Sequence, residues 1–598
     1  MSPRPRSSAP VLIGALLVAA LAAFAYREAI TSDFTGGDTI ALIEVSRVKS
    51  FGDLVKVWTQ PMLPILTLFY RPVANFSYTI DHWIWGMDAR GFHITDVVVH
   101  AITSALVVVL VWRWSKHGLA ATLAGLSFAL HPILMETVPN PTRRQDMLGG
   151  MFMLLALCSL PDFKARKPRF VHWIPSLVAC ALALGAKEGS VVFPALVFAW
   201  AMLVGSVDAP GKPRWKSALR IAAPFAALTI AFVAVRAVIL GGAGGNEASW
   251  KWTASSMLAN LENIADYFDD LVYPLRAIFH PYLSGTDRAI AIAAAIGFCC
   301  MVPAMFRWWK STQAGSKGLF ALGMLALGAV LFFPAISAWL RGVIEQAYRN
   351  EAWPSVAAMI DSPRKQPVEL YVWKAFDLGR VLASGGLILL GVLLSLLWFR
   401  ARKLRPARSE ESGWMVFCLL WMGLHLSLFL AVQRYHAWNA YVPAIPFCCL
   451  LGLGVARSGE HARVKTGGAI LLMLFLAAFS PLVRSLEVWK ANGTFNSMLM
   501  AEIARIAREA PAGTTLEFRE LPNHNFSWHT NGPEPVSVYT LNAACTISLA
   551  KIEAPEKDLR VVVVSQKPVR EPFASIRLVS ETLEDRRVVV RAKITSAP

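Results

Sequence analysis

The chain has 598 residues, of which 55% are hydrophobic and only 16% are charged, and its formal net charge is +18 at pH 7. Soluble domains carry roughly 25% charged residues, so this deficit excludes an ordinary soluble protein. The lysines and arginines gather in short loops between apolar runs, which is the orientation signal of helical membrane proteins and not a nucleic-acid-binding surface. We therefore expect a polytopic protein surrounded by membrane lipids, with no nucleic acid among its partners.

The N-terminal segment fits two interpretations. Arg4 and Arg6 precede an apolar stretch that ends near residue 25, as in cleaved signal peptides and in retained first helices. We favour a retained helix because the loop that follows, 28–92, needs an anchor on its N-terminal side. This loop is too polar to span a bilayer, yet it is rich in the aromatic residues that membrane interfaces favour.

The later apolar runs are long enough for spanning helices, and with the first they predict about thirteen spans, an odd number that puts the termini on opposite sides. Basic loops such as 162–169 and 400–408 indicate a cytoplasmic N-terminus, so the longer aromatic loops face outward. The predicted spans are 10–27, 93–112, 119–136, 146–161, 171–186, 190–205, 219–240, 289–306, 318–338, 380–399, 414–432, 441–456 and 467–485.

The composition changes near residue 491. Runs such as 514–521, 558–566 and 586–594 alternate apolar and polar residues with the period of two that predicts strands, and 495–510 reads as a helix. We therefore expect an all-α polytopic membrane bundle over 1–490, followed by a small extracytoplasmic α/β domain over 491–598.

Charged groups are nearly absent from the interiors of the predicted spans and gather at their outer ends. The alternative interpretation is a non-catalytic lipid or glycan transporter or flippase. Charges at the outer ends do not favour it, because transporters of ions or protons usually keep such charges near the membrane midplane. A structural or sensor protein that binds through its tail would leave the charges unexplained. These charged groups are Asp33, Asp38, Arg71, Asp96, His100, His131, Glu136, Arg144, Asp146, Lys187, Glu188, Arg236, Arg434 and His436.

Several segments carry a resemblance to a known family. The segments YRPVANFSYTIDHWIWGMDARGFHITDVVVH, ALHPILMETVPNPTRRQDMLG, ALGAKEGSVVFPAL and QRYHAWNAYVPAIP resemble, in order, elements of the TMTC-type O-mannosyltransferases and their bacterial relatives. The resemblance implies a GT-C-like fold and a glycosyltransferase that takes its sugar from a polyprenyl-phosphate carrier. One acid, Asp38, stands where the family has a pair, Gln433 replaces a glutamate, and the C-terminal tetratricopeptide repeats are missing. These departures leave a protein, a glycan or a lipid open as the acceptor.

The resemblance and the chemistry of inverting transfer together predict roles for individual residues. A carboxylate must take the proton of the acceptor hydroxyl; Asp38 matches the family position, although it would equally suit the N-cap of a helix at 39–45. Asp33 is the second candidate base, and Glu136 would orient the acceptor. Cations would hold the lipid phosphate, with arginine's planar fork best suited to it. The candidates for the phosphate are Arg71, Arg144, Lys187, Arg236 and Arg434, and those for the sugar or acceptor are His93, His131, Glu188 and His436.

No metal-ligand spacing such as HExxH occurs, so no metal site is predicted, and the histidines are expected to pack against aromatic rings or contact the sugar. A divalent ion, Mg²⁺ or Mn²⁺, stays open as a cofactor, because phosphate oxygens and water could complete its shell at Asp38. The eight cysteines form no CxxC pair, and their spacing predicts no set of disulfides. The lack of disulfides favours a bacterial inner (plasma) membrane over an endoplasmic reticulum.

Overall fold

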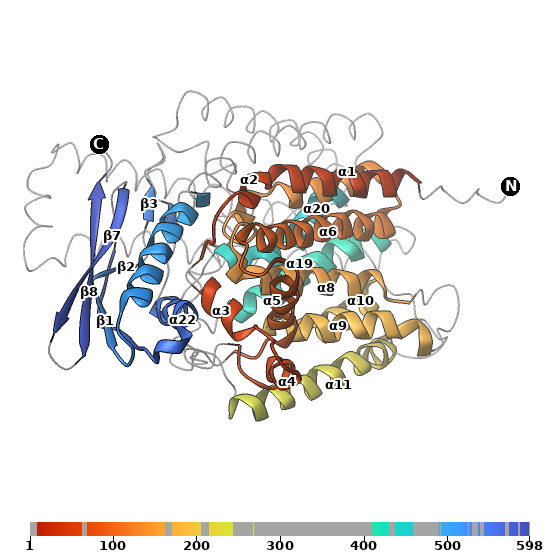
Figure 1. Ribbon diagram of the computed structural model, residues 1–598. Helices are drawn as coiled ribbons and strands as arrows, with labels where there is room; N and C mark the ends of the chain where they lie inside the picture. The colour runs from red at the N-terminus through yellow and green to blue at the C-terminus, as the bar shows by residue number, and fades with distance from the viewer. Residues whose placement is uncertain are drawn as a thin grey trace, which may run out of the picture.

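The computed structural model consists of a helical body and a smaller part with a β-sheet at one end (Figure 1). The residues that the structure describes are 9–36, 38–62, 69–161, 170–204, 214–242, 267, 409–429, 437–457, 489–490, 492–523, 526–528, 536–538, 543–568, 573–583 and 586–596.

The helical body is built from apolar helices that lie roughly side by side (Figure 1). Helices α6 and α8 run parallel: Arg144 at the start of α8 contacts Asp96 near the start of α6, and Arg113 near the end of α6 donates to the Cys158 carbonyl at the end of α8. The helices are α1 (Ala9–Ala25), α6 (Ala89–Ser115), α7 (Gly118–Ala129), α8 (Arg144–Cys158), α9 (Ile174–Ala186), α10 (Phe193–Leu203), α11 (Arg214–Leu240), α19 (Ser409–Phe429) and α20 (Tyr441–Arg457).

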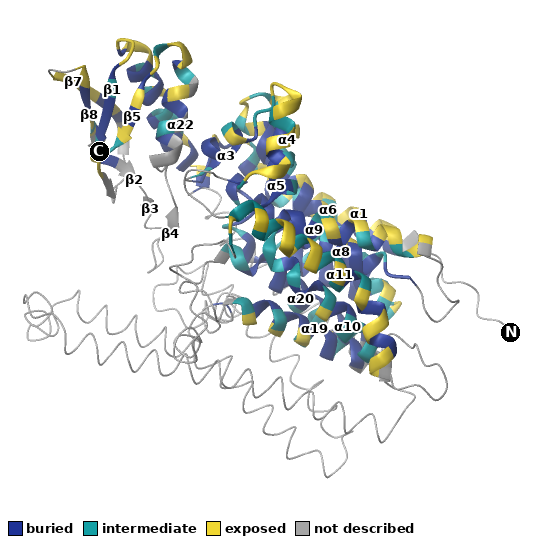
Figure 2. Cartoon of the chain, turned by 90° about the horizontal axis from the view of Figure 1, so that it is seen from below, coloured by how far each residue is buried: buried dark blue, intermediate teal, exposed yellow. Residues whose placement is uncertain are grey.

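Each predicted span that falls on described residues overlaps one of these helices, whereas 289–306, 318–338, 380–399 and 467–485 lie outside the described residues. By length and composition, three helices of the described chain could cross a membrane: Ala89–Ser115, Trp215–Leu240 and Trp438–Ala456. The apolar faces of α1 and α11 are exposed, with Ile13 at 66% and Val238 at 83% (Figure 2). Such surfaces suit contact with lipid chains.

One predicted span is too long. The apolar run 119–136 suggested a helix to Glu136, but α7 ends at Ala129 and the chain continues in turns and short 3-10 helices up to Arg143. The physical reason is the run of prolines at Pro132, Pro139 and Pro141, which lack an amide donor and clash with a continuing helix.

The loop between α1 and α6 folds into short helices. Helix α4 begins with a capping box in which Ser50 and Asp53 satisfy each other's backbone amides, and α5 begins with Pro72 in its first turn, where no donor is needed. Phe51 and Trp83 on these helices are exposed. The short helices are α2 (Arg27–Ile30), α3 (Thr39–Val45), α4 (Phe51–Thr59) and α5 (Pro72–Trp85).

The C-terminal part contains a four-stranded sheet in the order β5-β1-β8-β7. Strand β1 (Thr515–Arg519) runs parallel to β5 (Arg560–Val563) and to β8 (Arg587–Ser596), and β8 pairs antiparallel with β7 (Phe573–Leu583). Helical residues 492–509 and α22 (Ala543–Glu553) accompany this sheet, so the predicted helix-and-strand pattern is confirmed. The remaining strands form two small pairs: β2 (Leu521–Asn523) with β6 (Gln566–Pro568), and β3 (Phe526–Trp528) with β4 (Val536–Val538).

The C-terminal part packs on the loop that precedes α6, and α22 lies beside α3 in both views (Figures 1 and 2). Phe34 and Ile40 belong to the same buried apolar cluster as Phe495 and Ile503. Asn496 Nδ2 donates to the Phe34 carbonyl at 3.1 Å. The boundary predicted at 490/491 therefore separates segments of the chain that share one hydrophobic core.

Candidate functional site

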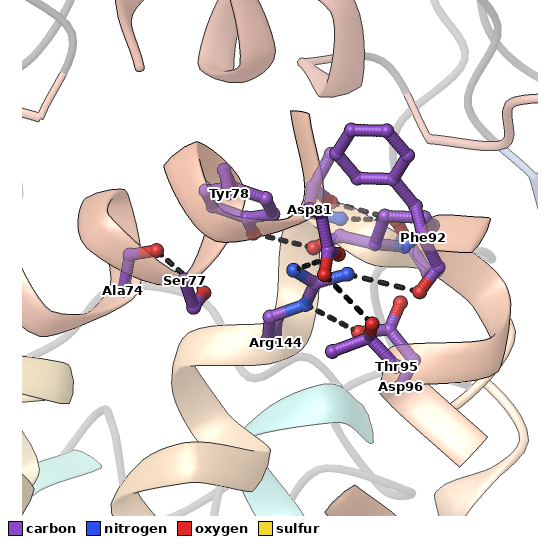
Figure 3. A network of polar contacts seen from close by, with 11 residues as sticks. Ala74, Ser77, Tyr78, Asp81, Phe92, Thr95, Asp96 and Arg144 are labelled. Carbon is purple, nitrogen blue, oxygen red and sulfur yellow. Dashed lines mark hydrogen bonds and ion pairs between the residues drawn. The ribbon is translucent and has the colours of Figure 1, made fainter. Parts of the chain in front are cut away.

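A buried ion network joins the C-terminal half of α5 to the starts of α6 and α8 (Figure 3). Arg144, with 0% exposure, forms ion pairs through Nη1 with Asp81 Oδ2 and through Nε with Asp96 Oδ1, each at 2.6 Å. Its Nη2 donates to the Phe92 carbonyl at 2.9 Å, and its guanidinium lies 4.7 Å from the centroid of the Tyr78 ring. This network fixes α5, α6 and α8 relative to one another, because removing one partner would leave uncompensated charge in the interior.

Two loops dock next to this network. Thr35 Oγ1 donates to the Pro139 carbonyl at 2.6 Å, and Tyr78 OH donates to the Pro141 carbonyl at 2.5 Å. Gly36 has a φ of +83°, and a Cβ there would lie 2.2 Å from Asn140 Oδ1, so this position requires glycine. The loop that carries Asp38 is thereby held against the loop that precedes α8.

Asp38 is half-buried at the start of α3, and its charge interacts with that of Arg143 at the end of the second loop. It occupies the N-cap position, but its side chain makes no capping hydrogen bond. Capping of α3, the alternative role predicted for the Asp38 carboxylate, is therefore not observed. Asp33 is exposed, and its backbone carbonyl contacts His93 Nε2 at 3.1 Å.

A second set of charges lies at the starts of α5, α8 and η4 (Glu188–Val192). Arg71 binds Glu188 in a bidentate manner, with Nε–Oε2 at 2.7 Å and Nη2–Oε1 at 2.5 Å. Lys187 Nζ contacts Asp146 Oδ1 at 2.9 Å. The charge of Arg236, on α11, interacts with the charges of Glu188 and Arg71.

Arg143 connects this set to Asp38. Its charge interacts with the charges of Asp38, Asp146, Arg71 and Glu136, and its guanidinium lies 3.7 Å from the centroid of the Trp438 ring. Glu136 keeps some exposure, but burial raises the pKa of its carboxyl to about 7, against the lowering effect of Arg143. The residues of the site thus come from five separate stretches of the chain and include four cations and four carboxylates: Arg71, Arg143, Lys187, Arg236, Asp38, Glu136, Asp146 and Glu188.

The histidines lie in backbone and ring contacts. His93 is buried, and His100 contacts the Tyr441 hydroxyl through Nδ1 and the Ala129 carbonyl through Nε2, both at 3.1 Å. His131 Nδ1 accepts a hydrogen bond from the Ile133 amide at 3.2 Å. Arg434 and His436 lie outside the described residues.

The sequence analysis missed Arg143, Asp81 and Trp438. Arg143 stands next to Arg144, and no local pattern separates the roles of the two. In the described part of the chain, no three His, Cys, Asp or Glu side chains gather in a way that could hold a metal ion.

Comparison with known proteins gives matches to one group of enzymes. No protein-family model matches the chain. It is 34% identical to "Protein O-mannosyl-transferase TMTC2" of Mus musculus over 107 residues, which are 16% of this chain and 12% of the relative. It is 25% identical to "Protein O-mannosyl-transferase TMTC4" of Homo sapiens over 203 residues, 30% and 27% of the two chains. The matched stretches thus span between about an eighth and about a quarter of these relatives' lengths.

Among solved structures, ArnT from Cupriavidus metallidurans bound to undecaprenyl phosphate aligns with 93% of this chain and 90% of its own, at a TM-score of 0.38 and 14% identity. Archaeal oligosaccharyltransferase AglB from Archaeoglobus fulgidus, in complex with an inhibitory peptide and a dolichol-phosphate, aligns with 83% of this chain and 58% of its own, at a TM-score of 0.40 and 12% identity. The sequence matches confirm the predicted resemblance: the chain is similar to the protein O-mannosyl-transferases of the TMTC group.

Proposed function

We propose that the protein is a GT-C-type membrane glycosyltransferase. It moves a sugar from a polyprenyl-phosphate carrier to an acceptor on the extracytoplasmic face, with inversion at the anomeric carbon. The observation that carries the proposal is a set of four cations and four carboxylates, Asp38 among them, in which Arg143 interacts with Asp38, Asp146, Arg71 and Glu136. The names of the sequence relatives support the reaction class.

In this mechanism Asp38 is the general base. It accepts the proton of the acceptor hydroxyl while the hydroxyl oxygen bonds to the anomeric carbon, the bond from that carbon to the phosphate oxygen breaks, and the polyprenyl phosphate leaves. A positioned base typically contributes about 10²–10⁴-fold to such a step. The charge of Arg143 interacts with that of Asp38 and belongs to the same site. Asp33 remains the second candidate base, and Glu136 would orient the acceptor.

The charge that develops on the leaving phosphate needs cations nearby. Arg71 and Lys187 are held by Glu188 and Asp146, and an incoming phosphate would compete with these carboxylates for their donors. Arg236 lies within reach of the same charges. Arg434 stays a prediction as a phosphate ligand, and so does Arg144, although the three nitrogens of its guanidinium already contact Asp81, Asp96 and the Phe92 carbonyl. Contacts to the sugar or acceptor stay predicted for His93, His131, His436 and Glu188.

The membrane arrangement belongs to the same proposal. Helices α6, α11 and α20 are long and apolar enough to span, and about thirteen spans are predicted for the whole chain. The starts of α6 and α8, which carry Asp96 and Arg144, would then lie toward the outer face, with the N-terminus in the cytoplasm and the C-terminal part outside. We place the protein in the inner (plasma) membrane, with a protein, a glycan or a lipid as the acceptor.

The test is a transfer assay in membranes with radiolabelled polyprenyl-phosphate mannose, glucose and arabinose. We expect transfer from one of these donors, and a loss of about 10²–10⁴-fold in Asp38→Asn. Asp53→Asn is the matched control, because it removes a half-buried carboxylate from the same loop, and the amide oxygen of Asn can still accept the hydrogen bonds at the start of α4. Full transfer by Asp38→Asn would remove Asp38 from the base role. Movement of the carrier lipid across the membrane without any transfer would favour the flippase alternative instead.

A further inference from the structure

Two adjacent arginines, Arg143 and Arg144, differ completely in their surroundings. The side chain of Arg144 is 0% exposed, and its three guanidinium nitrogens face Asp96, Asp81 and the Phe92 carbonyl. For Arg144 to turn toward a ligand, it would have to leave two buried carboxylates without a counter-charge. Its geometry is that of a structural anchor (Figure 3).

Arg143 has the opposite character. It keeps some exposure, and its Nε is buried without a hydrogen-bond partner among the described residues. Buried donors of this kind are rare in native proteins and are expected to have a partner in the functional state. An oxygen of a bound ligand would satisfy this donor.

The ring of Trp438 fixes the plane of the Arg143 guanidinium. The guanidinium carbon lies 3.7 Å from the ring centroid, and Trp438 belongs to η7 (Ala437–Ala440), directly before α20. An aromatic ring against one face of a guanidinium attracts the cation and leaves its edge, which carries the N–H donors, available for planar acceptors. A phosphate group accepts such a fork with two oxygens.

The charges around Arg143 connect it to the site of the proposed function. Its guanidinium interacts with Asp38, the base of the proposed function, and with Asp146, Glu136 and Arg71. In an inverting transfer the base and the leaving phosphate lie on opposite sides of one sugar carbon. Arg143 interacts with the base and has an unsatisfied N–H donor, so it can stabilise the charge of the phosphate that leaves the same carbon.

We propose that Arg143, stacked on Trp438, is the arginine of this pair that binds the lipid-linked phosphate, and that Arg144 serves only to position the start of α8. The inference rests on the proposed function, because it assigns the donor's phosphate to a residue of the same site. Neither Arg143 nor Trp438 was among the residues that the sequence analysis selected.

The experiment measures binding of a sugar-free polyprenyl phosphate to the purified full-length protein in lipid nanodiscs. Arg143→Gln should weaken binding by about 10- to 100-fold, the effect of losing a charged hydrogen-bonding group. Arg143→Lys keeps the charge but loses the forked donor geometry of arginine, so its affinity should lie between those of the wild type and Arg143→Gln. Trp438→Phe should bind nearly as wild type, and Trp438→Ala more weakly. Arg27→Gln is the control, because Arg27 also lies against an aromatic ring, that of Phe24, but is exposed and pairs with Glu28.

Wild-type binding by folded Arg143→Gln would overturn the inference, with the melting temperature as the check on folding. If Arg143→Gln does not fold, unchanged binding by Trp438→Ala would overturn it instead. A protein that binds the carrier through Arg143 but transfers no sugar would sink the proposed glycosyltransferase while leaving the phosphate assignment intact. Transfer that depends on Asp38 but not on Arg143 would support the proposed glycosyltransferase and overturn the assignment of the phosphate to Arg143.

Discussion

Replacing Arg144 by methionine should unfold or strongly destabilise the protein. The two ion pairs of Arg144 have N–O distances of 2.6 Å, and each corresponds to about 6 kcal/mol of attraction at an effective dielectric constant of about 20. Much of this attraction offsets the cost of removing three charges from water. Measured losses of one partner from a buried ion pair are about 3–5 kcal/mol, and we expect Arg144→Met to cost a similar amount.

The pH dependence of this variant has a definite sign. Burial raises the pKa of Asp81, and Arg144 opposes that shift. Without Arg144, the pKa of Asp81 in the folded protein should therefore rise further above its value of about 3.9 in the unfolded chain. A carboxyl with a raised pKa contributes stability while it is protonated and loses it as pH rises through the folded pKa. The free energy of unfolding of Arg144→Met should therefore fall as pH increases from about 4.

The assay is denaturant unfolding of the full-length protein in detergent, for wild type, Arg144→Met and the triple variant that adds Asp81→Asn and Asp96→Asn. The triple variant should recover most of the lost stability, because it removes the uncompensated charges together with the arginine. Wild-type stability of Arg144→Met at neutral pH, or no recovery in the triple variant, would refute the assignment of Arg144 as an internal anchor.

Two further predictions concern the surroundings of Asp38. Burial raises the pKa of Glu136 to about 7, so if its carboxylate orients the acceptor, transfer should rise with pH through this value, and Glu136→Gln should remove the inflection. A pH–rate profile that keeps its inflection in Glu136→Gln assigns the titration to another group. A Cβ at Gly493 would lie 3.0 Å from the Asp33 backbone, so Gly493→Val should displace the loop that leads to Asp38 and lower transfer about tenfold or more. Gly454→Val is its control, because a Cβ there meets no atom within 4 Å; equal activity of the two variants would show that the contact of the C-terminal part does not position the loop.

Much of the secondary structure was predictable because its signals are local. Apolar runs of sufficient length indicated α6, α11 and α20, and the period-two alternation near 515 and 587 indicated β1 and β8. The helix at 39–45 also occurs, as α3. The exception is α7, which ends early because prolines follow it, and this signal was present in the sequence.

The candidate site was predictable only as a set of charges at one membrane face. The predicted outward-facing loops and span ends lie on one side of the membrane, so Asp38, Arg71 and Lys187 could be expected on the same side. The carboxylate that each cation binds could not be predicted from the sequence. Arg71 and Glu188, for example, are 117 residues apart and meet only through the packing of α5 on α9.

The sequence by itself determined that this chain forms apolar helices with an α/β part at its C-terminal end, because hydrophobic length and periodicity act over neighbouring residues. The tertiary structure decided that Arg144 is enclosed by Asp81 and Asp96, that Arg143 lies on Trp438, and that the C-terminal part packs against the loop of Asp38. The partners of buried charges depend on which helices meet, and no local pattern in the sequence distinguishes Arg144, which is buried, from its neighbour Arg143.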